Sequence, residues 1–180
     1  MEIKITHVAD CQVKSRNKNL ETPTKHNLQE IENYVRNSKS QIHVIAGDLF
    51  EFATPNEIER KLIYEHILNL LKIDSLKELV IIAGNHNIVK EKKKELEYQN
   101  NIQPNAISIF TDVLNSGLEV TDKLRYFSNS GVYNSSVSNR IRYIVYSRED
   151  QHFFDWNTLK DSDKLVTEKG QSTVNICLYH

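Results

Sequence analysis

The sequence has only two cysteines, no long hydrophobic run and almost no net charge. Two cysteines cannot build a disulfide framework, and Cys11 and Cys177 both lie in apolar runs, so we expect two buried free thiols in a reducing compartment. No run approaches the ~20 apolar residues of a membrane-spanning helix, and no basic segment precedes an apolar one at the N-terminus. We therefore expect a cytoplasmic protein without a membrane partner.

Positive and negative charges balance. Lys and Arg number 23 against 24 Asp and Glu, for a net charge of −1. No overall field attracts the chain to nucleic acid, so a site for a polyanion has to be local. A chain of 180 residues has the size of one domain with a sizeable core. We expect a single domain over residues 1–180.

Short runs rich in β-branched residues alternate with helical patterns in the first half. Residues 3–9, 42–46 and 79–83 are predicted strands, and residues 26–37 and 55–72 are predicted helices. This order predicts an α/β fold with a largely parallel sheet. In the second half we expect a helix near 149–160, a polar loop over 128–140 and strands over 106–110, 118–121, 124–127, 141–146 and 174–179.

Side chains that can bind metal ions follow four of these strands. They are Asp10, Asp48, Asn85, His86 and His180. Ligands of open α/β sheets bind beyond the carboxyl ends of the strands, so these side chains can converge. Gly47 and Gly84 come directly before Asp48 and Asn85 and permit tight turns. Carboxylate, amide oxygen and imidazole suit Mn²⁺, Fe²⁺ or Zn²⁺, so the pattern predicts a divalent metal site.

Two such ions about 3.5 to 4 Å apart can hold a phosphate, generate a hydroxide and stabilise an in-line displacement. One carboxylate has to bridge them, and Asp48 is the candidate because it follows the middle of the three early strands. His86, next to Asn85, would lie over the phosphate and stabilise charge or protonate the leaving oxygen.

Three motifs carry a family resemblance. "HVAD", "IIAGNH" and "GDLF" followed after four intervening residues by Pro55, together with an apolar strand that ends in His180, resemble the calcineurin-like metallophosphoesterase superfamily. "GDLF" with its proline resembles the SbcD-type DNA-repair nucleases, including their phage relatives. The resemblance covers essentially the whole chain. It implies a layered β-sheet sandwich flanked by helices.

The resemblance also implies a role for each motif residue. Asp10 would bind the first metal, Asp48 would bridge both metals, and Asn85 and His180 would bind the second. His86 would act on the substrate phosphate.

Two departures from the family pattern concern this site. Gln12 stands where the first motif normally has histidine, and an amide oxygen is the weaker donor, so the first metal site should be poorer. Asn87 follows the third motif where an acidic residue is common, which removes a charge that would orient His86. The family's Gly-His-any-His element would come after His180. We therefore expect a fold incomplete at the C-terminus, a fragment or truncated form, with weak or incomplete metal binding.

The resemblance implies a metal-dependent phosphodiesterase acting on DNA, an exo- or endonuclease subunit of a recombination or repair complex. Two divalent ions would activate its hydroxide, Mn²⁺ foremost, with Mg²⁺, Fe²⁺ or Zn²⁺ as alternatives. Its partners would be DNA, an SbcC-like ATPase subunit and a second copy packed through helix 55–72 and the segment after Asn87. Lys14, Arg16 and Lys18, in a predicted loop over 14–25, are candidate DNA contacts, although a solvated loop is the simpler interpretation.

Three other interpretations stay open. A phosphatase or small phosphodiesterase of the same superfamily fits the near-zero charge, because DNA-binding proteins usually have a basic footprint. Gln12 and Asn87 also fit a metal-impaired domain that only binds DNA or the ATPase. Taken singly, Asp10, Asp48 and Asn85 could be turn residues or helix N-caps.

Overall fold

The structure is a computed structural model that describes residues 2–15, 18–82, 84, 113, 122–127, 129–146 and 173–179. Two helices and seven strands lie in these residues. In chain order they are β1 (Ile5–Ala9), α1 (Lys18–Ser38), β2 (Ile42–Ala46), α2 (Glu57–Leu71), β3 (Glu78–Ile82), β4 (Leu124–Phe127), β5 (Gly131–Asn134), β6 (Ile141–Tyr146) and β7 (Val174–Tyr179).

The strands form two sheets. The first has the order β1-β2-β3-β4, and every neighbouring pair in it is parallel. In the second, β5 pairs antiparallel with β6, and β6 pairs parallel with β7. The prediction of an α/β fold with a largely parallel sheet is therefore confirmed.

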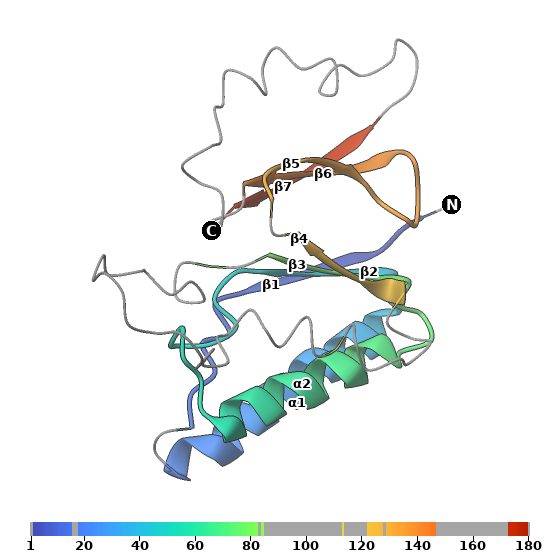
Figure 1. The fold of residues 1–180 in the computed structure, drawn as a ribbon. Coiled ribbons are helices and arrows are strands. Elements are labelled where there is room, and N and C mark those ends of the chain that lie inside the picture. Colours follow the sequence, from blue (N-terminus) through green and yellow to red (C-terminus); the bar gives the residue numbers. More distant parts are fainter. Residues whose placement is uncertain are drawn as a thin grey trace, which may run out of the picture.

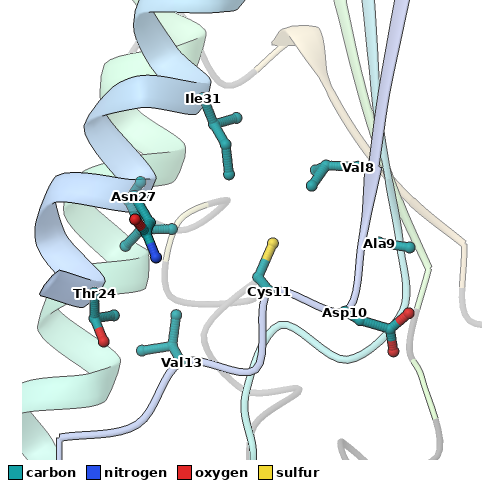
Figure 2. A pocket seen from close by; sticks show the side chains of 9 residues that line it. Val8, Ala9, Asp10, Cys11, Val13, Thr24, Asn27 and Ile31 are labelled. Atoms are coloured by element: carbon teal, nitrogen blue, oxygen red, sulfur yellow. The ribbon is translucent and has the colours of Figure 1, made fainter. Parts of the chain in front are cut away.

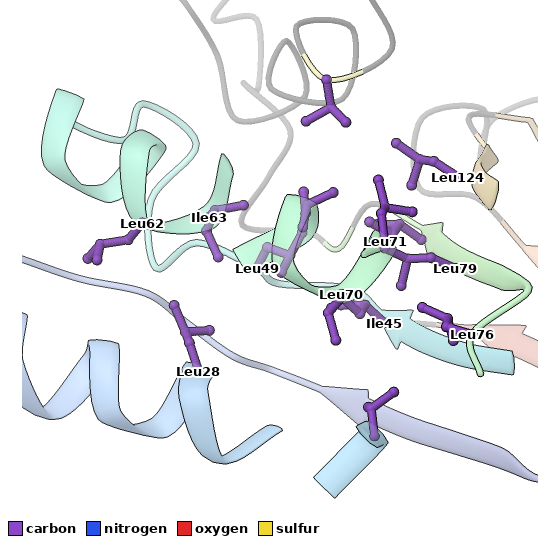
Figure 3. Close-up of a cluster of buried hydrophobic side chains, with 14 of the residues drawn as sticks. Leu28, Ile45, Leu49, Leu62, Ile63, Leu70, Leu71, Leu76, Leu79 and Leu124 are labelled. Atoms are coloured by element: carbon purple, nitrogen blue, oxygen red, sulfur yellow. The ribbon is translucent and has the colours of Figure 1, made fainter. Parts of the chain in front are cut away.

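The elements stack in three layers, with the first sheet between the two helices and the second sheet (Figure 1). The central strands β2 and β3 are buried along their whole length, as expected for parallel strands covered on both faces. One apolar cluster joins the sheet to the helices and includes Leu28, Ile45, Ile63 and Leu79 (Figure 3). A second joins the two sheets. It includes Val44, Val80, Phe127, Tyr143 and Val145.

Helix α2 is capped at both ends by side chains. At its N-terminus, Asn56 and Glu59 form a capping box in which each side chain accepts a hydrogen bond from the other residue's backbone N–H. At its C-terminus, Lys123 Nζ donates to the carbonyl groups of Leu71 and Ile73 at 2.8 and 3.3 Å. Both caps satisfy backbone groups that the helix itself leaves without partners.

Several expectations about local structure were wrong. Helix α1 begins at Lys18 rather than at residue 26, so the predicted loop over 14–25 is mostly helical, with Pro23 inside it. The predicted polar loop over 128–140 contains strand β5, which is only four residues long. Cys177 is exposed and Cys11 only partly buried, although both are free thiols. The strands expected over 106–110 and 118–121 and the helix near 149–160 lie outside the described residues.

No helix in the described part of the chain is long and apolar enough to cross a membrane.

Candidate metal centre

The first two candidate ligands follow neighbouring parallel strands. Ala9, the last residue of β1, is paired with Ala46, the last residue of β2. Asp10 comes directly after β1, and Asp48 comes two residues after β2. Because the strands are parallel and in register, both carboxylates leave the sheet at the same edge, as the sequence predicts.

The backbone at this edge adopts a conformation that few residues tolerate. Asp10, Gln12 and Asp48 have φ angles of 54°, 44° and 39°, and Gly47 has a φ of 81°. Left-handed conformations cost residues with a Cβ roughly 1–3 kcal/mol, least for Asp and Asn. Three strained residues at the predicted ligand positions indicate that the surrounding structure fixes the backbone there.

Backbone hydrogen bonds tie the two loops together. Gln12 N donates to Asp48 O at 2.8 Å, and Val13 N donates to Leu49 O at 2.9 Å. Val13 and Phe50 continue the parallel pairing beyond the strands as an isolated bridge. These bonds therefore couple the loop of Asp10 to the loop of Asp48.

Gly84, which opens the third motif, lies against Asp48. A Cβ built on Gly84 would collide with the Asp48 carboxylate and backbone amide. Only glycine can approach so closely, which is the role that its place before the motif predicts. The described backbone therefore brings the start of the third motif to the Asp48 carboxylate.

Asp48 itself is buried, with 2 % of its surface exposed. Removing a carboxylate from water is costly unless cations or hydrogen-bond donors balance its charge. A buried carboxylate at the shared edge of parallel strands is a suitable ligand for a hard or borderline divalent ion. The residues present therefore fit the metal that the sequence predicts.

Cys11, between Asp10 and Gln12, faces the other way. Its thiol points into a cavity of about 240 Å³ between β1 and α1, which Thr24 and Asn27 also line, whereas the Asp10 carboxylate points away from that helix (Figure 2). Burial, and then the charge of Asp10, raises the pKa of the Cys11 thiol to about 11. The thiol is therefore protonated at neutral pH, and it faces this cavity rather than the Asp10 carboxylate.

The other predicted site residues lie partly outside the described residues. Asn85, His86, His180 and Arg16 belong to that group. Lys18 belongs to α1 rather than to a loop. Lys14 is half exposed, and its Nζ forms an ion pair with Glu51 at 3.7 Å.

No three His, Cys, Asp or Glu side chains come together as a metal site within the described ranges. Asp10 and Asp48 therefore account for one part of the predicted ligand set. The backbone bonds from Gln12 and Val13 join the two loops that carry these carboxylates.

The prediction missed one residue that supports these loops. Glu59 is 1 % exposed, and one of its carboxylate oxygens accepts a hydrogen bond from Ser15 N at 2.7 Å. The signature of a capping box, Asn56 followed three residues later by Glu59, is visible in the sequence. The bond to Ser15, 44 residues away, is not.

Parallel strands that place carboxylates at a shared edge, between a helical layer and a second sheet, fit a metal-dependent hydrolase of the α/β class. Residues 3–180 match the calcineurin-like phosphoesterases, and the chain belongs to this family. Its members hydrolyse phosphoesters and generally bind two divalent metal ions. No curated protein matches the chain in a sequence comparison.

Proposed function

We propose that the chain is a metal-dependent phosphodiesterase acting on DNA, the nuclease subunit of a recombination or repair complex. The observation that carries the phosphodiesterase chemistry is the meeting of Asp10, Asp48 and Gly84 at one edge of a parallel sheet. The choice of DNA rests on the motif "GDLF" followed by Pro55, which resembles the SbcD-type nucleases.

In this proposal Asp10 holds the first metal and Asp48 bridges both. Asn85 and His180 hold the second, and Gln12 contributes a weak amide ligand to the first. Bound divalent ions, Mn²⁺ foremost, would supply Lewis acidity and an activated water. The Asp48 carboxylate keeps these ions together.

The remaining chemistry belongs to His86. Its imidazole would donate a proton to the leaving oxygen, or stabilise the charge that develops on the phosphate. Asn87, which follows it, is neutral and cannot supply the negative charge that would raise the basicity of His86.

The proposed partners are DNA, an SbcC-like ATPase and a second copy of the chain. Lys14, Arg16 and Lys18 are the proposed DNA contacts, and Lys14 remains half exposed beside Glu51. Most apolar side chains of α2 are buried in the core, but Ile58 is 44 % exposed and Phe52, in the preceding loop, is 38 % exposed. The second copy would pack through helix 55–72, where Ile58 is exposed, and through the segment after Asn87.

The test compares two substrates and three proteins. The wild-type chain, Asp48→Ala and His86→Ala are each incubated with Mn²⁺ and either linear duplex DNA or an aryl phosphodiester. We expect the wild type to degrade DNA from its ends and both variants to lose at least ~100-fold of that rate, as expected for a metal bridge and a general acid. Equal DNA degradation by the wild type and both variants would refute the proposed site.

A small phosphoester is the second candidate substrate, because the net charge of −1 gives no basic footprint for DNA. Hydrolysis of the aryl ester without attack on DNA would select it. If the chain binds DNA but hydrolyses neither DNA nor the aryl ester, the result would favour the metal-impaired domain that Gln12 suggests.

A further inference from the structure

Glu59 uses both of its carboxylate oxygens on backbone donors. Oε2 accepts from Asn56 N at 2.9 Å, which completes the capping box of α2. Oε1 accepts from Ser15 N at 2.7 Å. A capping box needs only one carboxylate oxygen, so helix capping leaves the bond to Ser15 unexplained.

Ser15 is the last described residue of the loop that begins with Asp10. Its hydroxyl also lies 3.2 Å from the side-chain amide of Asn56, so two of its groups are held at the N-terminus of α2. The near end of the loop is held by the bond from Gln12 N to Asp48 O. Hydrogen bonds therefore join the loop after β1 to the loop after β2 and, at Ser15, to the N-terminus of α2.

The loop needs these hydrogen bonds because its backbone is in an unfavourable conformation. Asp10 and Gln12 both have left-handed φ angles, of 54° and 44°. Conformations of this kind persist only where the surroundings over-determine them. Without the bond to Ser15, the backbone bonds of Gln12 and Val13 would hold the loop alone, and the left-handed conformations at Asp10 and Gln12 would be less tightly fixed.

The burial of Glu59 agrees with a purpose beyond capping. A carboxylate that is 1 % exposed loses its hydration, which costs free energy. Two backbone N–H donors and the positive end of the α2 dipole offset that cost. A solvated glutamate would cap the helix without incurring the cost.

We infer that Glu59 is a positioning residue for the first metal site, because its carboxylate fixes the loop that carries Asp10 and Gln12. The inference rests on the proposed function, in which Asp10 holds the first metal. Glu59 does not touch the metal, and acts through Ser15.

The experiment separates positioning from stability. Glu59→Ala removes both acceptors, Glu59→Gln keeps one of them, and Lys123→Ala weakens the same helix from its other end. Two quantities are measured on the chain and each variant: the exchange rate of the Ser15 amide without metal, relative to that of Ile45 in β2, and the Kd for Mn²⁺ from electron paramagnetic resonance of the free ion.

We expect Glu59→Ala to speed exchange at Ser15 at least tenfold relative to Ile45 and to raise the Kd for Mn²⁺ about tenfold, with Glu59→Gln in between. Lys123→Ala should leave both quantities unchanged while it lowers the thermal midpoint. Unchanged exchange at Ser15 in Glu59→Ala, or the same loss of Mn²⁺ affinity in Lys123→Ala, would overturn the inference. Failure of the wild-type chain to bind Mn²⁺ would instead contradict the proposed function, and the exchange rates would still decide whether Glu59 holds the loop.

Discussion

At the scale of single residues, the metal centre depends on backbone conformations as much as on ligands. Asp10, Gln12 and Asp48 all have positive φ angles, and Gly84 approaches Asp48 so closely that no Cβ fits. Aspartate is among the residues that tolerate the left-handed region best, so the same residue type serves both geometry and metal binding. A substitution here would change where a ligand lies as well as what it is.

His43 is a buried histidine that stays neutral. It is 2 % exposed, its Nδ1 shares a 2.8 Å hydrogen bond with Thr6 Oγ1, and its Nε2 is buried without a described partner. Burial, followed by the charges of His66 and His7, lowers the pKa of His43 from 6.5 to about 4. Protonation of His43 would place a charge between the sheet and the helices with no acceptor for Nε2.

This pKa predicts acid sensitivity. Between pH 6.5 and 4 the unfolded chain binds a proton at His43 that the folded chain does not. The contribution of neutral His43 to stability is therefore fully present above pH 6.5 and is lost as the pH falls toward 4. The lowered pKa corresponds to ~3 kcal/mol, at ~1.4 kcal/mol per pH unit. Urea unfolding at pH 7 and pH 4 measures how much free energy of unfolding is lost on acidification. This loss should be smaller by about that amount in His43→Val than in the wild type. An equal loss in both proteins would contradict the prediction.

At the scale of elements, Glu78 joins the two sheets. It begins β3, is completely buried, and accepts hydrogen bonds from Ser136 N at 3.0 Å, from Tyr143 Oη at 2.6 Å and from the Ser135 hydroxyl. Arg125 of β4 pairs with it at 3.1 Å. Burial, and then the bond to Glu78, raises the pKa of Tyr143. One carboxylate thus connects β3, β4, β6 and the segment after β5.

Removal of this carboxylate should weaken the contact between the sheets. We expect Glu78→Ala to cost ~3–5 kcal/mol in the free energy of unfolding, because it leaves Arg125 and the Tyr143 hydroxyl without their partner. Lys61→Ala is the matched control. It breaks an exposed ion pair with Glu65 and should cost at most ~0.5 kcal/mol. Similar denaturant midpoints for the two variants would show that Glu78 does not hold the sheets together.

The order of the early elements was predictable because it depends on local patterns. Apolar runs such as residues 42–46 and the helical repeat over 55–72 identify β2 and α2 directly. The start of α1 was not predictable, since residues 18–25 are mostly polar and include Pro23, which normally ends or kinks a helix. Strand β5 was missed because four residues between serines and asparagines resemble a loop.

Part of the candidate site could be predicted for the same reason. Asp10 and Asp48 follow their strands in the sequence, and parallel pairing brings strand ends to one edge. The hydrogen bond that supports the site could not be predicted, because it joins residues far apart in the chain. Glu59 meets Ser15 across 44 residues, at 2.7 Å.

At the scale of the whole molecule, the three layers give the metal centre a rigid frame. Helices cover one face of the parallel sheet and the second sheet covers the other (Figure 1), so β2, which carries the loop of Asp48, is buried on both sides. A frame of this kind holds ligands in place before a metal arrives. It fits a phosphoesterase, in which the positions of two ions decide the rate.

The binding of Mn²⁺ by the wild-type chain and by Asp48→Ala, measured by isothermal titration calorimetry, tests the central claim most directly. In the proposed site Asp48 would bridge both metals, so its removal should lower the affinity for Mn²⁺ at least tenfold and abolish any second binding event. Lys61→Ala, on the exposed face of α2, should bind Mn²⁺ as the wild type does. Equal Mn²⁺ affinity in the wild type and Asp48→Ala would contradict a metal centre at the strand ends.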